Sequence, residues 1–318
     1  MIGYDWRRMD TILVRRAAAG GGLLVAVLLV VLLARSCGGD ADGGTNAGAQ
    51  ASPTPKPIEL PGGGRQIFPA HRIVGFYGHP ADDELGELGI GSPASAGQRL
   101  LKQARGFERP KREVLPVMEL LATVATYDPG PDGTYRRRTT NGIIRRYLRA
   151  ARQIDALLVL DIQPGNAPFL PEAKHLERWL REPDVGLALD PEWHVPEGQV
   201  PGSVIGSVDA ADVNAVATWL DDLTERGRLP QKLFLVHQFT EDMIKGKEQL
   251  RPHANLATVL NADGFGSKEV KSAKYHTFTR GVPWTFDGFK LFYREDLDLM
   301  TPREVLRLRP SPDVIVYE

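Results

Sequence analysis

The sequence predicts an α/β fold, a closed (β/α)8 TIM barrel preceded by one hydrophobic N-terminal segment and a disordered linker. Eight short runs rich in Val, Ile, Leu and Phe follow residue 66, and helical patterns separate them. This alternation predicts parallel strands with right-handed crossovers, in either an open doubly wound sheet or a closed barrel. Eight strands in about 250 residues favour the barrel. No Gly-rich phosphate loop follows the first run, and the open sheet remains the alternative.

Turn-forming residues bound the eight predicted strands. In chain order the strands are Ile73–Gly78, Val114–Leu120, Ala156–Gln163, Val185–Trp193, Lys232–Phe239, Leu256–Asp263, Gly288–Tyr293 and Asp313–Tyr317. Apolar residues at helical spacing predict seven helices between them. These are Gly97–Phe107, Asn141–Arg152, Pro171–Arg181, Ala210–Arg226, Glu241–Leu250, Ser267–Tyr275 and Pro302–Leu308.

The chain begins with a predicted membrane signal. Residues 1–16 form a basic region with four arginines, and within residues 17–36 the 18 residues Ala17–Ala34 carry no charge. A span of about 20 apolar residues crosses a bilayer. The excess of arginine before the segment predicts a cytoplasmic N-terminus and an exported remainder. We therefore expect a barrel outside the cytoplasm, anchored in the cell membrane, or secreted if the segment is cleaved.

The sole cysteine, Cys37, directly follows the apolar segment. Its position resembles the lipid-attachment site of bacterial lipoproteins; Ser36 fits that pattern, whereas Arg35 departs from it. Lipidation of Cys37, an uncleaved anchor and simple cleavage all remain open. Residues 37–65 are rich in Gly and Pro and are predicted to be a flexible tether for the barrel domain, residues 66–318.

The charge balance excludes one class of partner. The chain holds 39 Lys and Arg against 40 Asp and Glu, for a formal net charge of −1, and its basic residues are scattered. Nucleic acid is therefore not a predicted partner. A single cysteine also excludes intrachain disulfides and thiolate metal clusters, and no cofactor is predicted.

The fourth predicted strand indicates which side chains face the barrel interior. Successive side chains of a strand point to opposite faces, so the bulky odd-numbered residues of 185–189 face the helices. The small Gly186 and Ala188 then face the crowded interior, and their row ends in Asp190 and Glu192. Polar groups are therefore expected at the C-terminal end of this strand.

Polar side chains end most of the other strands too. Active sites of such barrels lie at the C-terminal rim, so we expect these side chains to meet in one solvent-reachable hollow. Carboxylates held close together raise one another's pKa, as a general acid requires. The predicted catalytic residues are Glu192, Asp190, Asp263 and Asp161. The predicted substrate-binding residues are Tyr77, His79, Glu119, Gln163, Trp193, His237, Gln238, Asn261, Trp284 and Tyr293.

The motif Leu189-Asp190-Pro191-Glu192-Trp193 resembles the Asp-x-Glu at the end of the fourth strand in glycoside hydrolase barrels, notably the chitinase-like family and the lysozyme-type muramidases. The resemblance implies that Glu192 donates a proton to the glycosidic oxygen and that Asp190 assists it. It covers this motif and the predicted fold. Of the fuller D-x-x-D-x-D-x-E pattern, only the last Asp and the Glu are present.

Three functions are compatible with this rim. A glycosidase would use Glu192 as the acid, with Asp263 or Asp161 as nucleophile or base, on a polysaccharide or oligosaccharide. A metal-dependent hydrolase would bind a divalent ion through Asp161, Glu192, His237 and Asp263, although no H-x-H or H-E-x-x-H cluster supports it. A barrel without turnover would bind cell-wall polysaccharide or a partner protein. The first is the function that we expect, with no resident metal.

Overall fold

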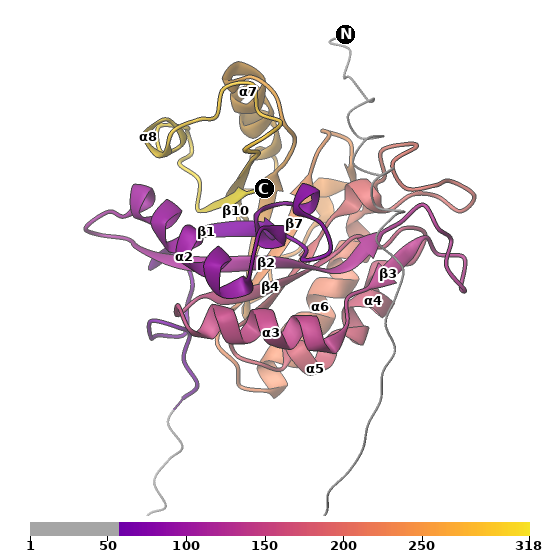
Figure 1. Ribbon diagram of the computed structural model, residues 1–318, viewed down its shortest axis with the longest axis horizontal. Coiled ribbons are helices and arrows are strands. Elements are labelled where there is room, and N and C mark those ends of the chain that lie inside the picture. The colour runs from indigo at the N-terminus through magenta and orange to yellow at the C-terminus, as the bar shows by residue number, and fades with distance from the viewer. Residues whose placement is uncertain (1–56) are drawn as a thin grey trace, which may run out of the picture.

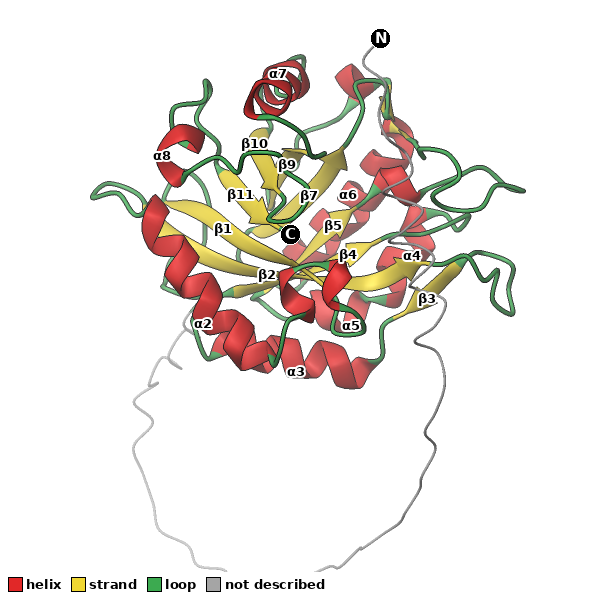
Figure 2. Ribbon diagram, turned by 45° about the horizontal axis from the view of Figure 1, so that its top comes forward, coloured by secondary structure: helices red, strands yellow, loops and turns green. Residues whose placement is uncertain are grey.

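The computed structural model describes residues 57–318, and eight parallel strands close into a barrel in its centre (Figure 2). The order around the barrel is β1-β11-β10-β9-β7-β5-β4-β2, and β2 pairs with β1 to complete it. The bounds are β1 His71–Gly78, β2 Glu113–Ala125, β4 Leu157–Ile162, β5 Val185–Leu189, β7 Lys232–Gln238, β9 Leu256–Ala262, β10 Phe286–Leu291 and β11 Val314–Tyr317. The predicted TIM barrel is confirmed, and all eight predicted strands overlap these.

Helices cover the outside of the barrel, as Figure 1 shows for α2 and α3 beneath β1 and β2. The helices are α2 Pro93–Ala104, α3 Asn141–Arg152, α4 Phe169–His175, α5 Glu177–Leu180, α6 Ala210–Arg226, α7 Lys268–Phe278 and α8 Pro302–Val305. Local sequence defines several of their ends. Ser92 forms a capping box with Ser95 and is followed by a proline, the arrangement typical of a helix start.

The predicted helix at Glu241–Leu250 is wrong. Residues Ile244–Lys245 form the short strand β8, which pairs with β6 Val208–Asp209, and only Lys247–Gln249 makes a single 3-10 turn. Gly246 lies between them in the left-handed region, at φ +67°, which interrupts a right-handed helix. Lys247 turns back to donate hydrogen bonds to Gln238 Oε1 and to the carbonyl of Phe278.

Two apolar layers hold the barrel, one on each face of the strands. Outward side chains such as Leu187 and Leu189 pack with the helices, and the inward Ala188 belongs to a separate interior cluster. The interior cluster includes Leu60, Ile67 and Phe68, which precede β1 and are at most 4% exposed. The folded domain therefore begins before residue 66, within the end of the predicted linker.

The predicted membrane segment, Cys37 and most of the linker lie outside the described residues. Within residues 57–318, no helix is both long enough and apolar enough to span a bilayer.

Beyond the barrel, β2 extends to pair antiparallel with β3 Arg136–Arg138. This extension raises one side of the C-terminal rim.

Candidate active site

Inward-facing side chains at the C-terminal ends of the strands form a polar ring inside the barrel. Strand register brings them to one level, because Tyr77 lies opposite Glu119 between β1 and β2, and His237 lies opposite Asn261 between β7 and β9. Every member is at most 2% exposed, so the predicted residues do meet, but not in the solvent-reachable hollow that the sequence predicted. The central ring consists of Tyr77, Glu119, Asp161, Gln163, Asp190, His237, Asn261, Asp263 and Lys290. Eight of these nine residues were predicted from the sequence, and Lys290 was not.

Small residues in the strands allow the close strand approach beneath and beside this ring. A Cβ on Gly288 of β10 would lie 2.4 Å from Oδ1 of Asn261, and one on Gly186 of β5 would lie 2.6 Å from the carbonyl oxygen of Leu233. Both distances are too short for any side chain. Glycine at these positions therefore leaves the space that the ring and the neighbouring strands occupy.

His237 joins two sides of the ring. Its Nε2 lies 2.9 Å from Oε1 of Glu119, and its Nδ1 lies 2.8 Å from Oδ2 of Asp263. Burial by itself lowers the pKa of His237, but the Glu119 carboxylate and the hydrogen bonds to Asp263 and Glu119 outweigh it. The pKa of His237 therefore lies well above its usual value, and the imidazolium donates to both carboxylates.

Lys290, at the end of β10, carries a buried positive charge. Its Nζ lies 3.2 Å from Oδ2 of Asp263, 2.7 Å from Oε2 of Glu318 and 3.7 Å from the centre of the Tyr77 ring. Burial lowers the pKa of Lys290, but Asp263 and Glu318 outweigh it and raise that pKa well above its usual value. In turn, burial raises the pKa of Asp263, but Lys290 and His237 hold it below its usual value. Asp263 is therefore an ionised carboxylate.

Asp190, directly after β5, is held by neutral donors. Tyr77 Oη and Gln163 Nε2 each donate to its Oδ2, at 3.2 Å. Gln163 is itself fixed, because its Oε1 accepts from the backbone N–H of Ala125 at 3.3 Å. Burial raises the pKa of Asp190, while His237 and Lys290 act in the opposite direction.

Asp161, at the end of β4, is fully buried without a hydrogen bond. Neither of its oxygens has a partner among residues 57–318. Burial, followed by the charge of Asp190, raises its pKa well above the usual value. The raised pKa favours the protonated form of Asp161.

Glu192 lies at the outer edge of the ring, in a single 3-10 turn that starts at Pro191. The residue is partly exposed, but its Oε2 is buried and has no hydrogen-bond partner among the described residues. Loss of water around the carboxyl group, followed by the charges of Asp190 and Asp263, raises its pKa well above the usual value. The raised pKa favours the protonated form of Glu192, next to the ionised Asp263.

Several predicted site residues lie apart from the central ring. Gln238 donates to the carbonyls of Thr240 and Glu241 and so supports the loop after β7. Trp284 precedes β10, at the N-terminal end of the barrel opposite the rim, and packs against the helix-facing core. This removes Trp284 from the candidate site, because loop residues before and after a parallel strand lie at opposite ends of it.

Three other predicted residues lie on the rim outside the ring. Tyr293 stacks on Tyr317, with ring centres 5.1 Å apart. Trp193 is 7% exposed and packs with Ala125 and Tyr127, so its indole ring is covered. His79 Nε2 lies 2.9 Å from Oγ1 of Thr139.

A pocket of about 160 Å³ opens on the rim beside the end of β2. Its lining combines apolar surface with a few polar groups, and includes His79, Asp82, Val124, Ala125, Arg137 and Thr139. It adjoins the central ring through Ala125, whose N–H is bonded to Gln163. Mostly apolar pockets with a few convergent polar groups are typical ligand sites.

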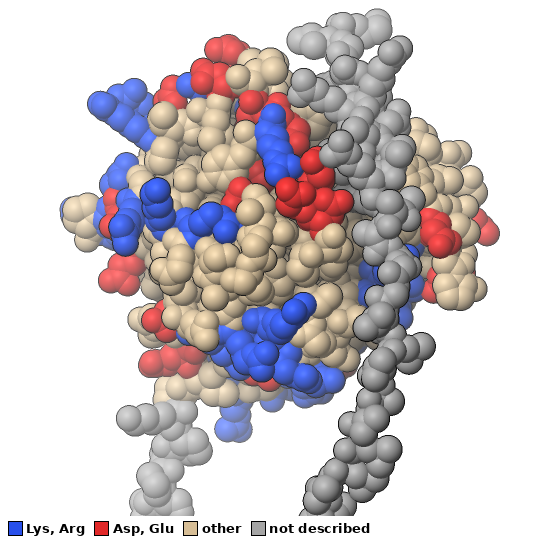
Figure 3. Space-filling model, in the orientation of Figure 1, with Lys and Arg blue, Asp and Glu red and all other residues tan. Residues whose placement is uncertain are grey.

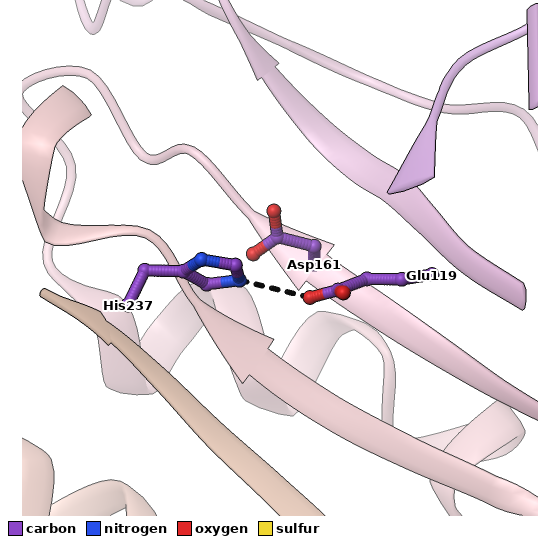
Figure 4. A group of neighbouring side chains, drawn as sticks. All are labelled: Glu119, Asp161 and His237. Carbon is purple, nitrogen blue, oxygen red and sulfur yellow. Dashed lines mark hydrogen bonds and ion pairs between the residues drawn. The ribbon is translucent and has the colours of Figure 1, made fainter. Parts of the chain in front are cut away.

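Two groups of ring residues have the ligand types for a metal ion. They are Glu119 with Asp161 and His237, shown in Figure 4, and Asp190 with His237 and Asp263. Within each group, one ligand atom per residue lies within 4.8 Å of the others. Carboxylate oxygen and imidazole nitrogen together suit divalent transition metals.

Acidic side chains also gather on the surface near the C-terminus, in the middle of the face that Figure 3 shows. A small rim pocket there is lined by Asp83, Glu84, Glu87, Glu295 and Glu318, together with Arg294 and Tyr293. Sequence interpretation missed Glu318 as well as Lys290. Strand alternation was the signal that could have identified both residues. Lys290 faces inward like Gly288, two positions earlier, and Glu318 faces inward like Val316.

The charge state of Glu318 makes stability depend on pH. Burial raises its pKa to about 7, although Lys290 opposes the shift. A carboxyl group whose pKa is raised in the native state stabilises the fold fully at pH values below its pKa in the unfolded chain, near 4.5. That stability is lost as pH rises through 7. Through this group, the free energy of unfolding of the parent should fall by about 2 to 3 kcal/mol between pH 4.5 and pH 7.5. The Glu318→Gln variant should lack this fall. Urea denaturation across this range measures it, and identical slopes in both proteins would refute it.

In comparisons with known proteins, the sequence matches no protein-family model and no curated protein.

Proposed function

We propose that the barrel is a glycoside hydrolase that acts on a polysaccharide or oligosaccharide through carboxylic acid and carboxylate chemistry. The observation that carries the proposal is Glu192, a partly exposed carboxyl group at the edge of a buried acidic ring, where its raised pKa favours the protonated form. A protonated carboxyl group at neutral pH is the general acid that cleavage of a glycosidic bond requires.

The second carboxylate of the mechanism is Asp263. Glycosidases pair a proton donor with an ionised carboxylate, which stabilises or attacks the developing oxocarbenium ion, or activates water. Asp263 keeps its charge because Lys290 and His237 both contact its Oδ2. Of the two candidates, Asp161 fits this role less well, since its raised pKa favours the neutral form.

Asp190 would then be the residue that assists Glu192. It is fixed by Tyr77 and Gln163, and its negative charge contributes to the raised pKa of Glu192. The 160 Å³ rim pocket beside β2, whose lining includes neither Glu192 nor Asp263, is the candidate position for a sugar unit away from the cleaved bond. With residues 17–36 as an anchor, the substrate would be a cell-wall or environmental polysaccharide outside the cytoplasm.

The proposal is tested by a hydrolysis screen with the full-length chain. Release of reducing ends is measured from purified bacterial cell wall, chitin oligosaccharides, and α- and β-linked glucans. Turnover of one class supports the proposal. If the chain binds one of these polymers in a pull-down but releases no product from any, the barrel is a carbohydrate-binding protein without turnover.

The pH profile of turnover tests the role of Glu192 directly. Because its raised pKa extends the protonated form to higher pH, kcat/KM should remain high above pH 5 and fall only as pH rises through the pKa of Glu192. Glutamine at position 192 should abolish this descending limb in any residual activity. If kcat/KM has already fallen near pH 4.5, the usual pKa of a glutamate, the assignment is contradicted.

A further inference from the structure

The group formed by Glu119, Asp161 and His237 contains carboxylate oxygens that make no hydrogen bond to the described residues. All three side chains are fully buried, and they come from three separate strands, β2, β4 and β7. Glu119 Oε2 and both oxygens of Asp161 have no hydrogen-bond partner among residues 57–318. Figure 4 shows Asp161 directed at the space next to the His237–Glu119 contact. Unpartnered buried oxygens are costly, so an absent partner is the simplest cause.

The distances between the ligand atoms of these three side chains suit the coordination of one shared ion. Two ligand atoms about 2.1 Å from one metal are about 3.0 Å apart when they are adjacent in an octahedral shell, and about 3.4 Å apart in a tetrahedral one. His237 Nε2 and Glu119 Oε1 are 2.9 Å apart, and the third ligand atom, from Asp161, lies within 4.8 Å of both.

The Nδ1 atom of His237 contacts a carboxylate, as the second nitrogen of a metal-bound histidine often does. Nδ1 lies 2.8 Å from Asp263, a carboxylate that can hold Nδ1–H and direct the Nε2 lone pair toward Glu119. Without an ion, a proton must occupy the space between Nε2 and Glu119 Oε1. A cation can replace that proton.

We propose that Glu119, Asp161 and His237 bind one divalent transition-metal ion, Zn²⁺ or Mn²⁺, inside the barrel. The mixed donor set favours these ions over Mg²⁺, which prefers all-oxygen shells. The alternative group of Asp190, His237 and Asp263 is less suitable, because Asp263 is already paired with Lys290 and Asp190 accepts from Tyr77 and Gln163. The site does not depend on glycosidase activity.

The test uses the full-length chain, treated with a chelator and then dialysed against Mn²⁺, Zn²⁺ or Mg²⁺. We expect about one Zn²⁺ or Mn²⁺ per chain after gel filtration, measured by elemental analysis, and a higher melting temperature than the metal-free chain. For Mn²⁺, the electron paramagnetic resonance signal of the free ion should disappear. Retention of Mg²⁺ alone, or of no ion at all, would overturn the proposal.

Two matched variants locate the ion. Asp161→Asn removes a ligand but no observed hydrogen bond, so the metal-free variant should fold like the parent by circular dichroism and lose stoichiometric metal. Asp190→Asn, a change of the same kind in the neighbouring group, should retain the ion. The reverse pattern, or equal binding by both, refutes this site even if the chain binds metal, and neither result depends on the hydrolysis screen.

Discussion

Replacing Glu192 with glutamine is expected to lower kcat by about 10²- to 10⁴-fold, the range that a positioned general acid contributes. Glutamine has nearly the same shape as glutamate but no proton to donate to the leaving oxygen. Since Glu192 is only partly buried and its Oε2 makes no hydrogen bond among the described residues, the fold and substrate affinity should remain close to those of the parent. Steady-state kinetics on the substrate found in the screen, with binding measured by calorimetry, separates these effects.

Glu87→Gln is the matched control for this prediction. Glu87 is also a rim carboxylate, but it is paired with Arg99 at 3.2 Å and lies outside the central ring. Its substitution should leave kcat within about twofold of the parent, because Glu87 contacts Arg99 and no residue of the central ring. Equal losses in the two variants, or full activity of Glu192→Gln, would show that Glu192 is not the acid.

Replacing Lys290 with methionine is expected to lower the free energy of unfolding by about 3 to 5 kcal/mol, the cost of removing one partner of a buried ion pair. Methionine fills a similar volume, but Asp263 and Glu318 then lose the ammonium group that they share. The loss should be smaller near pH 4, where Glu318, with a pKa of about 7, is protonated. Urea denaturation at pH 4 and pH 7.5 measures both effects.

Arg181→Met provides the control for the Lys290 variant. Arg181 forms an ion pair of 2.6 Å with Glu177, but the two side chains are 62% and 39% exposed. Its loss should change stability by less than about 0.5 kcal/mol. A Lys290 variant as stable as this control would mean that the ring carboxylates carry protons rather than charge.

The sequence predicted helices and strands well in segments where apolar residues follow a single helical or strand periodicity. The helices Asn141–Arg152 and Ala210–Arg226 end at the predicted residues, and strand alternation correctly separated Leu187 from Ala188. The helix predicted at Glu241–Leu250 failed because its apolar spacing was interrupted by Gly246, and pairing with β6 then decided the conformation.

The sequence alone determined the rows of side chains that face inward, and it favoured the barrel over an open sheet, because these follow from periodicity and from the number of strands. The same alternation could have identified Lys290, but a lysine in a strand resembles an exposed residue until a buried carboxylate is seen beside it. Only the tertiary structure decided which rim residues touch. Strand register and barrel closure bring His237 to Glu119, 118 positions apart, and place Trp284 at the opposite end, and no local pattern encodes distances between strands.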